Sequence, residues 1–176
     1  RKNNKVITTR GIHMDLYGRP MINIAGSSEN LTQVGGILSL YTDLLMKDRI
    51  ILATSFGADH NIGDFHIPQA HYLGFRQNLR GYLFQRFAGR TRAYNNTELR
   101  MNLGNVNLYL AKGPFGIFGF HDMARVWVDD ETSDTWHKGY GGGVWMAPFN
   151  KIVVTAAVTS SKEEKLVPLM SFGFQF

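Results

Sequence analysis

The sequence contains no cysteine, which excludes disulfide cross-links and thiolate chemistry. Charged residues make up only 19% of it, and the basic ones are scattered and form no Lys/Arg block, so the net charge of +5 does not predict nucleic-acid binding. No continuous apolar run approaches the roughly 20 residues of a membrane-spanning helix. Residues 1–5 are not followed by the apolar stretch of an intact secretory signal. We therefore expect either that a signal was removed or that the chain is the rear part of a longer protein.

Apolar and polar residues alternate along most of the sequence, which indicates strands, and no segment shows a convincing helical pattern. The alternating segments are 6–17, 33–46, 49–58, 93–104, 116–129, 138–146, 152–159 and 166–176. Residues 105–112 either extend the fourth segment or begin its return. The sequence therefore predicts one all-β domain over residues 1–176, built from eight antiparallel strands.

Three features favour a transmembrane β-barrel over a soluble β-sandwich or a lipocalin-like barrel, both of which would also show alternation. The segments are about 10 to 14 residues long, which matches a tilted crossing of a bilayer. An aqueous lumen accepts the charges and amides on the polar face, namely Asp15, Asp43, Glu98, Arg100 and Gln175. Aromatic residues gather toward strand ends, as interfacial girdles do: Tyr17, Trp127, Trp136, Trp145 and Phe149.

One long insert, residues 59–89, interrupts the alternation. Its segment 71–90 carries four arginines and five aromatic residues and is too apolar for a solvated linker. Inserts of this length in a short-looped chain are usually functional. We predict that the insert folds back into the barrel and is held there by its arginines. The lumen of a closed eight-stranded barrel is filled by side chains, so the insert favours a wider assembly, while closure as a small barrel or pairing with a second copy stays open.

Several motifs are arranged around the centre of the insert. The segments that carry them are 71–82, 96–99, 118–127, 141–144 and the aromatic end at Phe172, Phe174 and Phe176. Together they resemble the C-terminal half of the BamA-type outer-membrane insertase and bacterial surface antigen superfamily. The resemblance covers nearly the whole chain. It implies the second half of a 16-stranded outer-membrane barrel, with the long loop tucked inside.

The resemblance gives the loop tip and the chain end their expected roles. Arg80, Gly81 and Tyr82 match the family's loop-tip motif, although Leu79 stands where a valine is usual. The terminal aromatics match the family's C-terminal barrel signal: Phe172, Phe174 and Phe176. The glycine also has a physical reading, because a tight tip needs either a close approach of backbone to the wall or a positive φ.

Two carboxylates complete the predicted motif. Glu98 matches an acidic, lumen-facing residue of the family, and Asp122 matches the aspartate of an aromatic-x-Asp-x-Gly pattern in which Ala124 replaces the glycine. A guanidinium in a lumen is stabilised best by carboxylates that accept its paired N–H groups. Glu98 lies on the polar face of its strand, whereas the strand of Asp122 is apolar on both faces and its phase is open. Taken alone, Arg80 reads as a solvated loop arginine and Glu98 as an ordinary lumen carboxylate.

Other residues give no support for bond chemistry. His60 and His66 flank Asp64, but this spacing matches no compact metal site. The glycines of residues 139–143 lack the strand-to-helix context of a phosphate loop, and we interpret them as allowing strong curvature or a close approach of the insert. We therefore predict no enzymatic activity, no catalytic residue, no bound metal and no cofactor.

Two function classes follow from the resemblance. In the first, the chain belongs to an insertase or secretion factor of the outer membrane, in which strand pairing at a lateral seam templates the strands of unfolded outer-membrane proteins. In the second, it anchors or exports an N-terminal domain, such as the patatin-like lipase or metallophosphoesterase that some relatives carry. The expected partners are outer-membrane lipid, unfolded outer-membrane proteins, and a missing N-terminal half-barrel or a second copy. A free-standing barrel or a soluble β protein is the third alternative.

Overall fold

A computed structural model describes residues 2–3, 6–22, 30–44, 48–75, 78–108, 111–129 and 134–176. The strands of its large sheet are β1 (Gly11–Met21), β2 (Leu31–Asp43), β3 (Ile50–Ile62), β6 (Thr91–Leu108), β7 (Ala111–Trp127), β8 (His137–Met146), β9 (Val154–Ser161) and β10 (Val167–Phe172). Short elements are β4 (His71–Leu73), β5 (Phe87–Gly89) and the 3-10 turns η1 (Ile67–Gln69) and η2 (Pro148–Asn150). No helix among these residues is long and apolar enough to cross a membrane. The all-β prediction is confirmed.

The eight strands form one antiparallel sheet in the order β1-β2-β3-β6-β7-β8-β9-β10, so each strand pairs with its neighbours along the chain once the insert is left out. The β6–β7 pair is the longest and contains one irregularity, between Asn102 and Gly104. In the described part of the chain, β10 pairs with β9 alone, and β1 pairs with β2 and through a single bridge with Lys2, so neither edge of the sheet is covered by a strand. Pro20 and Pro168, which lack a backbone N–H donor, lie in these two edge strands.

Alternate residues separate two faces of the sheet. On the outer face of β1, the side chains of Ile12, Met14 and Leu16 are 52%, 65% and 71% exposed. On the inner face of β6, Glu98 and Arg100 are each 1% exposed. Apolar side chains thus point away from the curved sheet and charged ones point into it, which is the reverse of a soluble sandwich.

Two of the aromatic residues expected at a membrane interface face the interior instead. Trp145 on β8 is 2% exposed, and the hydroxyl of Tyr17 on β1 donates to Asp59 at 2.6 Å. Trp127 and Trp136 pack edge to face with ring centroids 6.1 Å apart. Alternation along each strand decides which of the aromatic residues near strand ends point outward.

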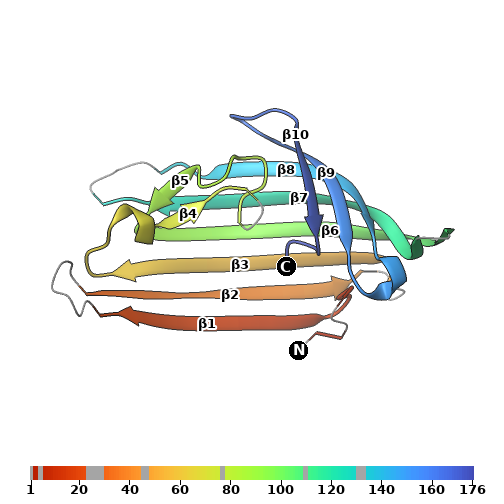
Figure 1. The fold of residues 1–176 in the computed structure, drawn as a ribbon, viewed down its shortest axis with the longest axis horizontal. Coiled ribbons are helices and arrows are strands. Elements are labelled where there is room, and N and C mark those ends of the chain that lie inside the picture. Colours follow the sequence, from red (N-terminus) through yellow and green to blue (C-terminus); the bar gives the residue numbers. More distant parts are fainter. Residues whose placement is uncertain are drawn as a thin grey trace.

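The insert lies against the inner face of the sheet. In Figure 1, β4 and β5 lie in front of β6 and β7, at the end of the sheet where β3 stops. The insert begins later than predicted, because β3 continues to Ile62 and residues 59–62 belong to the wall. Within the insert, β4 and β5 pair as a separate two-stranded sheet. Leu73, Leu79 and Tyr82 form a buried cluster with Ala124 of β7.

The last residues of the chain leave the wall. Strand β10 ends at Phe172, four residues before the predicted end, and Gly173 has a φ of +91°. In Figure 1, β10 runs steeply across the other strands and the C-terminus lies over the sheet. Phe172 is 76% exposed on the outer face, whereas the ring centroid of Phe174 lies 6.4 Å from that of Phe118 on the inner face of β7.

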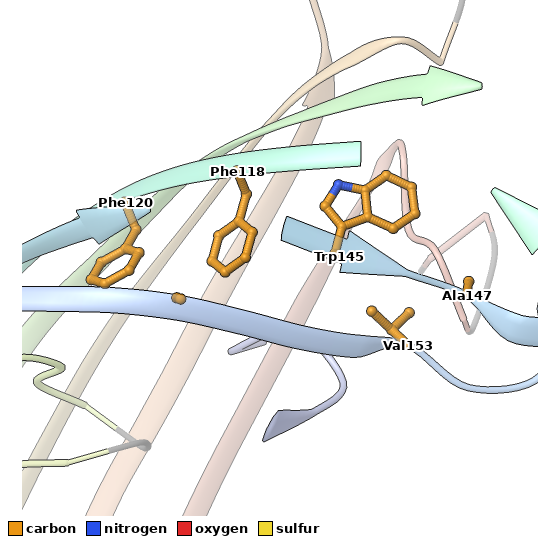
Figure 2. Packing of buried hydrophobic residues seen from close by; sticks show 6 residues of the cluster. Phe118, Phe120, Trp145, Ala147 and Val153 are labelled. Atoms are coloured by element: carbon orange, nitrogen blue, oxygen red, sulfur yellow. The ribbon is translucent and has the colours of Figure 1, made fainter. Parts of the chain in front are cut away.

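A second apolar cluster fills the interior near the chain end. Figure 2 shows Phe118 and Phe120 projecting from β7 to the same side of the sheet. They pack with Trp145, Ala147, Val153 and Ala157, and the partly buried Val6, Ile7, Leu169 and Phe174 cover this group. The inner face is therefore divided between the insert and this cluster.

Candidate functional site

The tip of the insert is shaped by Asn78. Its side-chain oxygen accepts a hydrogen bond from the backbone N–H of Gly74 at 3.0 Å, and its amide nitrogen donates to the carbonyl of Tyr72 at 3.1 Å. Asn96 of β6 donates to the carbonyl of Asn78 at 3.2 Å. Asparagine suits such turns because its short side chain can replace backbone partners. These bonds present the next residues, starting with Leu79 and Arg80, to the wall.

Arg80 binds two carboxylates on neighbouring strands. Its Nε and Nη2 atoms donate to the two oxygens of Asp122, each at 2.7 Å, and its backbone N–H donates to the same carboxylate at 3.0 Å. Its Nη1 atom donates to Oε1 of Glu98. The bidentate contact to Asp122 is the fork geometry that a guanidinium offers and an ammonium does not.

Strand register brings the two acids together. Glu98 of β6 is paired with Phe120 of β7, and Asp122 follows two residues later on the same face. The side chain of Asp122 therefore points inward, a direction that alternation alone leaves open. The structure thus places three of the residues singled out in the sequence, Arg80, Glu98 and Asp122, in one buried site.

The site is almost fully shielded from water. The side chains of Arg80, Glu98 and Asp122 are 3%, 1% and 0% exposed. Burial disfavours the charged form of Arg80, but its hydrogen bonds to Asp122 and the charges of both acids outweigh this, so the pKa of Arg80 lies above its ordinary value. Buried ion pairs of this kind contribute little net stability as a set, but removal of one partner costs about 3 to 5 kcal/mol.

Gly81 and Tyr82 fix the tip from the other side. Gly81 has a φ of +87°, and a Cβ there would lie 2.8 Å from the carbonyl oxygen of Ser160. The position therefore needs glycine for both its backbone conformation and the close approach. The ring of Tyr82 packs edge to face on Phe87 and His137, at centroid distances of 5.4 and 5.8 Å. The tip is thus held between β6–β7 and β8–β9.

Two inner-face residues that sequence reasoning did not assign to the site complete it. Arg100 donates from Nε to Oε2 of Glu98 at 2.8 Å. The guanidinium of Arg80 lies over the ring of Phe120 at 3.6 Å. Both stand two residues from an assigned acid on the same strand, so the period-2 pattern that placed Glu98 inward also places Arg100 inward. The two arginines and two acids balance in charge.

The base of the insert has its own ion pairs. Nε of Arg92 donates to Asp59 at 2.6 Å, and its Nη1 donates to the carbonyl of Tyr72 at 2.7 Å. Nε of Arg90 donates to Asp129 at 2.7 Å, and this hydrogen bond holds the pKa of Asp129 below its ordinary value. Arg86 and Glu163 are exposed and 3.4 Å apart. A pair as exposed as Arg86 and Glu163 contributes about 1 kcal/mol or less.

The arrangement holds a loop in place and offers no obvious bond chemistry. No group of three or more His, Asp or Glu side chains in the described residues is placed to hold a metal ion. Every acceptor oxygen of Glu98 and Asp122 faces an arginine, which leaves no free general base there. The site therefore acts as a clamp between the insert and the wall.

The three aromatic residues of the predicted C-terminal signal do not share one face in the structure. Phe172 ends β10 and points outward, while the guanidinium of Arg100 lies 3.9 Å from the ring centre of Phe174 and 5.5 Å from that of Phe176. The last two aromatics therefore adjoin the buried site. Alternation alone would have placed all three on one outward face.

The sequence profile described as the Omp85 superfamily domain matches residues 1–176. No curated protein matches the chain.

Proposed function

The chain belongs to the Omp85 superfamily of outer-membrane β-barrels that act in protein assembly and translocation, and we propose that its sheet is the second half of a 16-stranded barrel of this kind. The free edges of β1 and β10 support the proposal, because an open sheet edge cannot face lipid. The insert supports the proposal as well. It places β4 and β5 against the inner face, and the lumen of a closed eight-stranded barrel is already filled by side chains.

The observation that carries the functional proposal is the buried clamp of Arg80 on Glu98 and Asp122. It fixes the insert to β6 and β7, three strands away from the β10 edge. A fixed interior beside a seam at β10 suits a protein that offers an edge strand to the strands of a substrate, since backbone hydrogen bonds can then form with many sequences. The substrate class is unfolded outer-membrane protein, and the remaining partners are outer-membrane lipid and the other half of the barrel.

The test is an insertion assay. Lipid vesicles carrying the protein should accelerate the insertion of an unfolded outer-membrane barrel protein relative to empty vesicles, and Arg80→Ala should remove most of the acceleration. A protein that folds, keeps its insert protected and gives no acceleration would refute the assembly role. That outcome would favour the alternative role, an anchor or export barrel for an N-terminal domain.

The outward apolar face predicts detergent dependence. We expect the protein to be extracted only with detergent and to migrate faster on a gel before boiling than after it, because the folded barrel resists unfolding by the gel detergent. Circular dichroism should show β structure. Recovery of a stable monomer without detergent would contradict a membrane location.

With the insert on the outside face, the strand order predicts which other turns are exposed outside the cell. The turn after β9 lies on the same rim as the insert, and Lys162 there is exposed. Because the chain has no cysteine, Lys162→Cys introduces a unique label site, which a membrane-impermeant maleimide should reach in intact cells. Lys151→Cys, exposed near the opposite rim, is the control and should react only after lysis. Ser133, predicted to share the outer rim, lies outside the described residues. Protection of Lys162→Cys would reverse the assignment.

A further inference from the structure

Arg100 is shared between the insert clamp and the end of the chain. Its Nη2 atom lies 2.6 Å from Oε2 of Glu98, whose other oxygen binds Arg80. The same Nη2 atom donates to the carbonyl of Phe176 at 3.3 Å. One buried guanidinium therefore orients Glu98 toward the insert and also touches the last residue.

The terminal segment, residues 173–176, is seated in the interior by aromatic contacts. The ring of Phe174 packs on Trp145 with centroids 5.5 Å apart and lies beneath the guanidinium of Arg100. The ring of Phe176 packs on Tyr41 of β2 at 6.2 Å. The segment thus crosses the sheet from β10 toward β2.

The seated terminal segment is imperfectly packed. A cavity of about 290 Å³ lies between it and the clamp, lined on one side by Arg80 and Glu98 and on the other by Phe174 and Gln175. Three buried polar atoms of the terminal segment and of the residues that its rings contact have no hydrogen-bond partner among the described residues: the hydroxyl of Tyr41, Nε1 of Trp145 and Nε2 of Gln175. A buried donor without a partner is costly, so the amide of Gln175, which belongs to the segment itself, disfavours the seated position.

The alternative to this seat is an extended position in line with β10, which pairs with β9 alone. The aromatic and cation–π contacts favour the interior, and the cavity and the unpaired amide of Gln175 oppose it. The seated position of the segment is therefore stabilised by some features and opposed by others.

We propose that Arg100 is a positioning residue that couples the insert to the terminal segment: a seated segment strengthens the clamp on Arg80, and a docked insert favours the seated segment. The proposal rests on the proposed function in one respect, since it makes the length of the β10 edge depend on the insert. When the terminal segment leaves, Arg100 loses its contacts with Phe174 and Phe176 and holds Glu98 less rigidly. Linkage requires the coupling free energy to be the same in both directions.

The first experiment measures the insert while the terminal segment is changed. Phe174→Ala in the detergent-solubilised chain should raise the rate of chymotrypsin cleavage after the buried Tyr82 by about fivefold or more, the lower range of allosteric couplings. Phe172→Ala is the matched control, because it removes the same ring two residues away from an exposed outer position. Its rate should stay within about twofold of the parent on the same scale. Variants are compared only when they show heat-modifiable migration, and Phe174→Leu replaces Phe174→Ala if the latter does not fold.

The reciprocal experiment measures the terminal segment while the insert is changed. Gln175→Cys gives the chain a unique thiol whose alkylation reports release of the segment. Arg80→Ala should raise the alkylation rate by about fivefold or more, the same range as expected for cleavage of Phe174→Ala. Arg100→Lys keeps the charge but not the two-sided contact, and in that background both effects should disappear.

Equal cleavage of the Phe174→Ala and Phe172→Ala variants would overturn the coupling, provided that Arg80→Ala is cleaved faster and so validates the assay. Alkylation of Gln175→Cys that does not respond to Arg80→Ala would overturn it as well. Neither readout uses substrate insertion, so failure of the coupling is distinct from failure of the assembly role.

Discussion

Replacing Arg80 with alanine is expected to release the insert from the barrel wall. The variant leaves Asp122 buried without its arginine, and among the described residues Glu98 keeps Arg100 as its ion-pair partner. Loss of one partner from a buried ion pair costs about 3 to 5 kcal/mol. Chymotrypsin cleavage after Tyr82, which is 2% exposed, should become fast, and the folded form should lose its resistance to heat. Arg80→Lys should restore only part of the protection, because an ammonium cannot bind Asp122 at two points and reach Glu98 as well.

The matched control for this experiment is Arg86→Ala. Arg86 belongs to the same insert, but its side chain is 52% exposed and its contact with Glu163 is 3.4 Å long. Loss of such a surface pair costs about 1 kcal/mol or less. A double-mutant cycle between Arg80→Ala and Glu98→Gln then isolates the buried pair. Strictly additive effects, with an insert no more cleavable than in the Arg86→Ala variant, would show that Arg80 does not hold the insert.

The sheet was readable from the sequence because a strand with one apolar and one polar face has a period of two residues. That pattern located all eight strands and placed Glu98 and Arg100 on one face. It failed where both faces are apolar, as around Asp122, since the direction of that side chain is set by the register of β7 against β6. Register depends on a neighbouring strand, which no local pattern contains.

The insert and the chain end show a second limit. Sequence pattern predicted that the insert folds inward but not the β4–β5 pair within it, because three-residue strands carry too little alternation to be detected. At the chain end, alternation continued to Phe176 while the strand stopped at Phe172. Gly173, with its φ of +91°, redirects the backbone there, and the guanidinium of Arg100 receives Phe174. A contact between residues so far apart in sequence has no local signature.

The sequence predicts that the glycines of β8 allow either strong curvature or a close approach of the insert. At Gly139 the structure shows the close approach. A Cβ built at Gly139 would lie 1.7 Å from the carbonyl oxygen of Arg80. This oxygen belongs to the backbone of the insert tip, so it cannot move aside as a flexible side chain would. The backbone of β8 is equally constrained, because Gly139 pairs with Ser161 on β9 and with Asp122 on β7.

Gly139→Ala is therefore expected to push the insert off the wall, although the substitution replaces no charged residue of the clamp. Overpacking of a close contact costs about 1 to 3 kcal/mol and sometimes more, and the full displacement needed here should bring the variant close to Arg80→Ala in its cleavage after Tyr82. Gly119→Ala is the control on the neighbouring strand, since a Cβ there would meet nothing closer than 3.8 Å. It should be cleaved at the parent's rate.

Combining the two changes separates a local effect from general weakening of the sheet. If Gly139→Ala acts by displacing Arg80, then adding it to Arg80→Ala should increase cleavage far less than it does in the parent, because the same docked state is already lost. If it acts by weakening β8 itself, the two effects should add. Cleavage of Gly139→Ala at the rate of Gly119→Ala would show that the wall at Gly139 yields to the methyl group, and that the fit between β8 and the insert tip does not depend on a glycine.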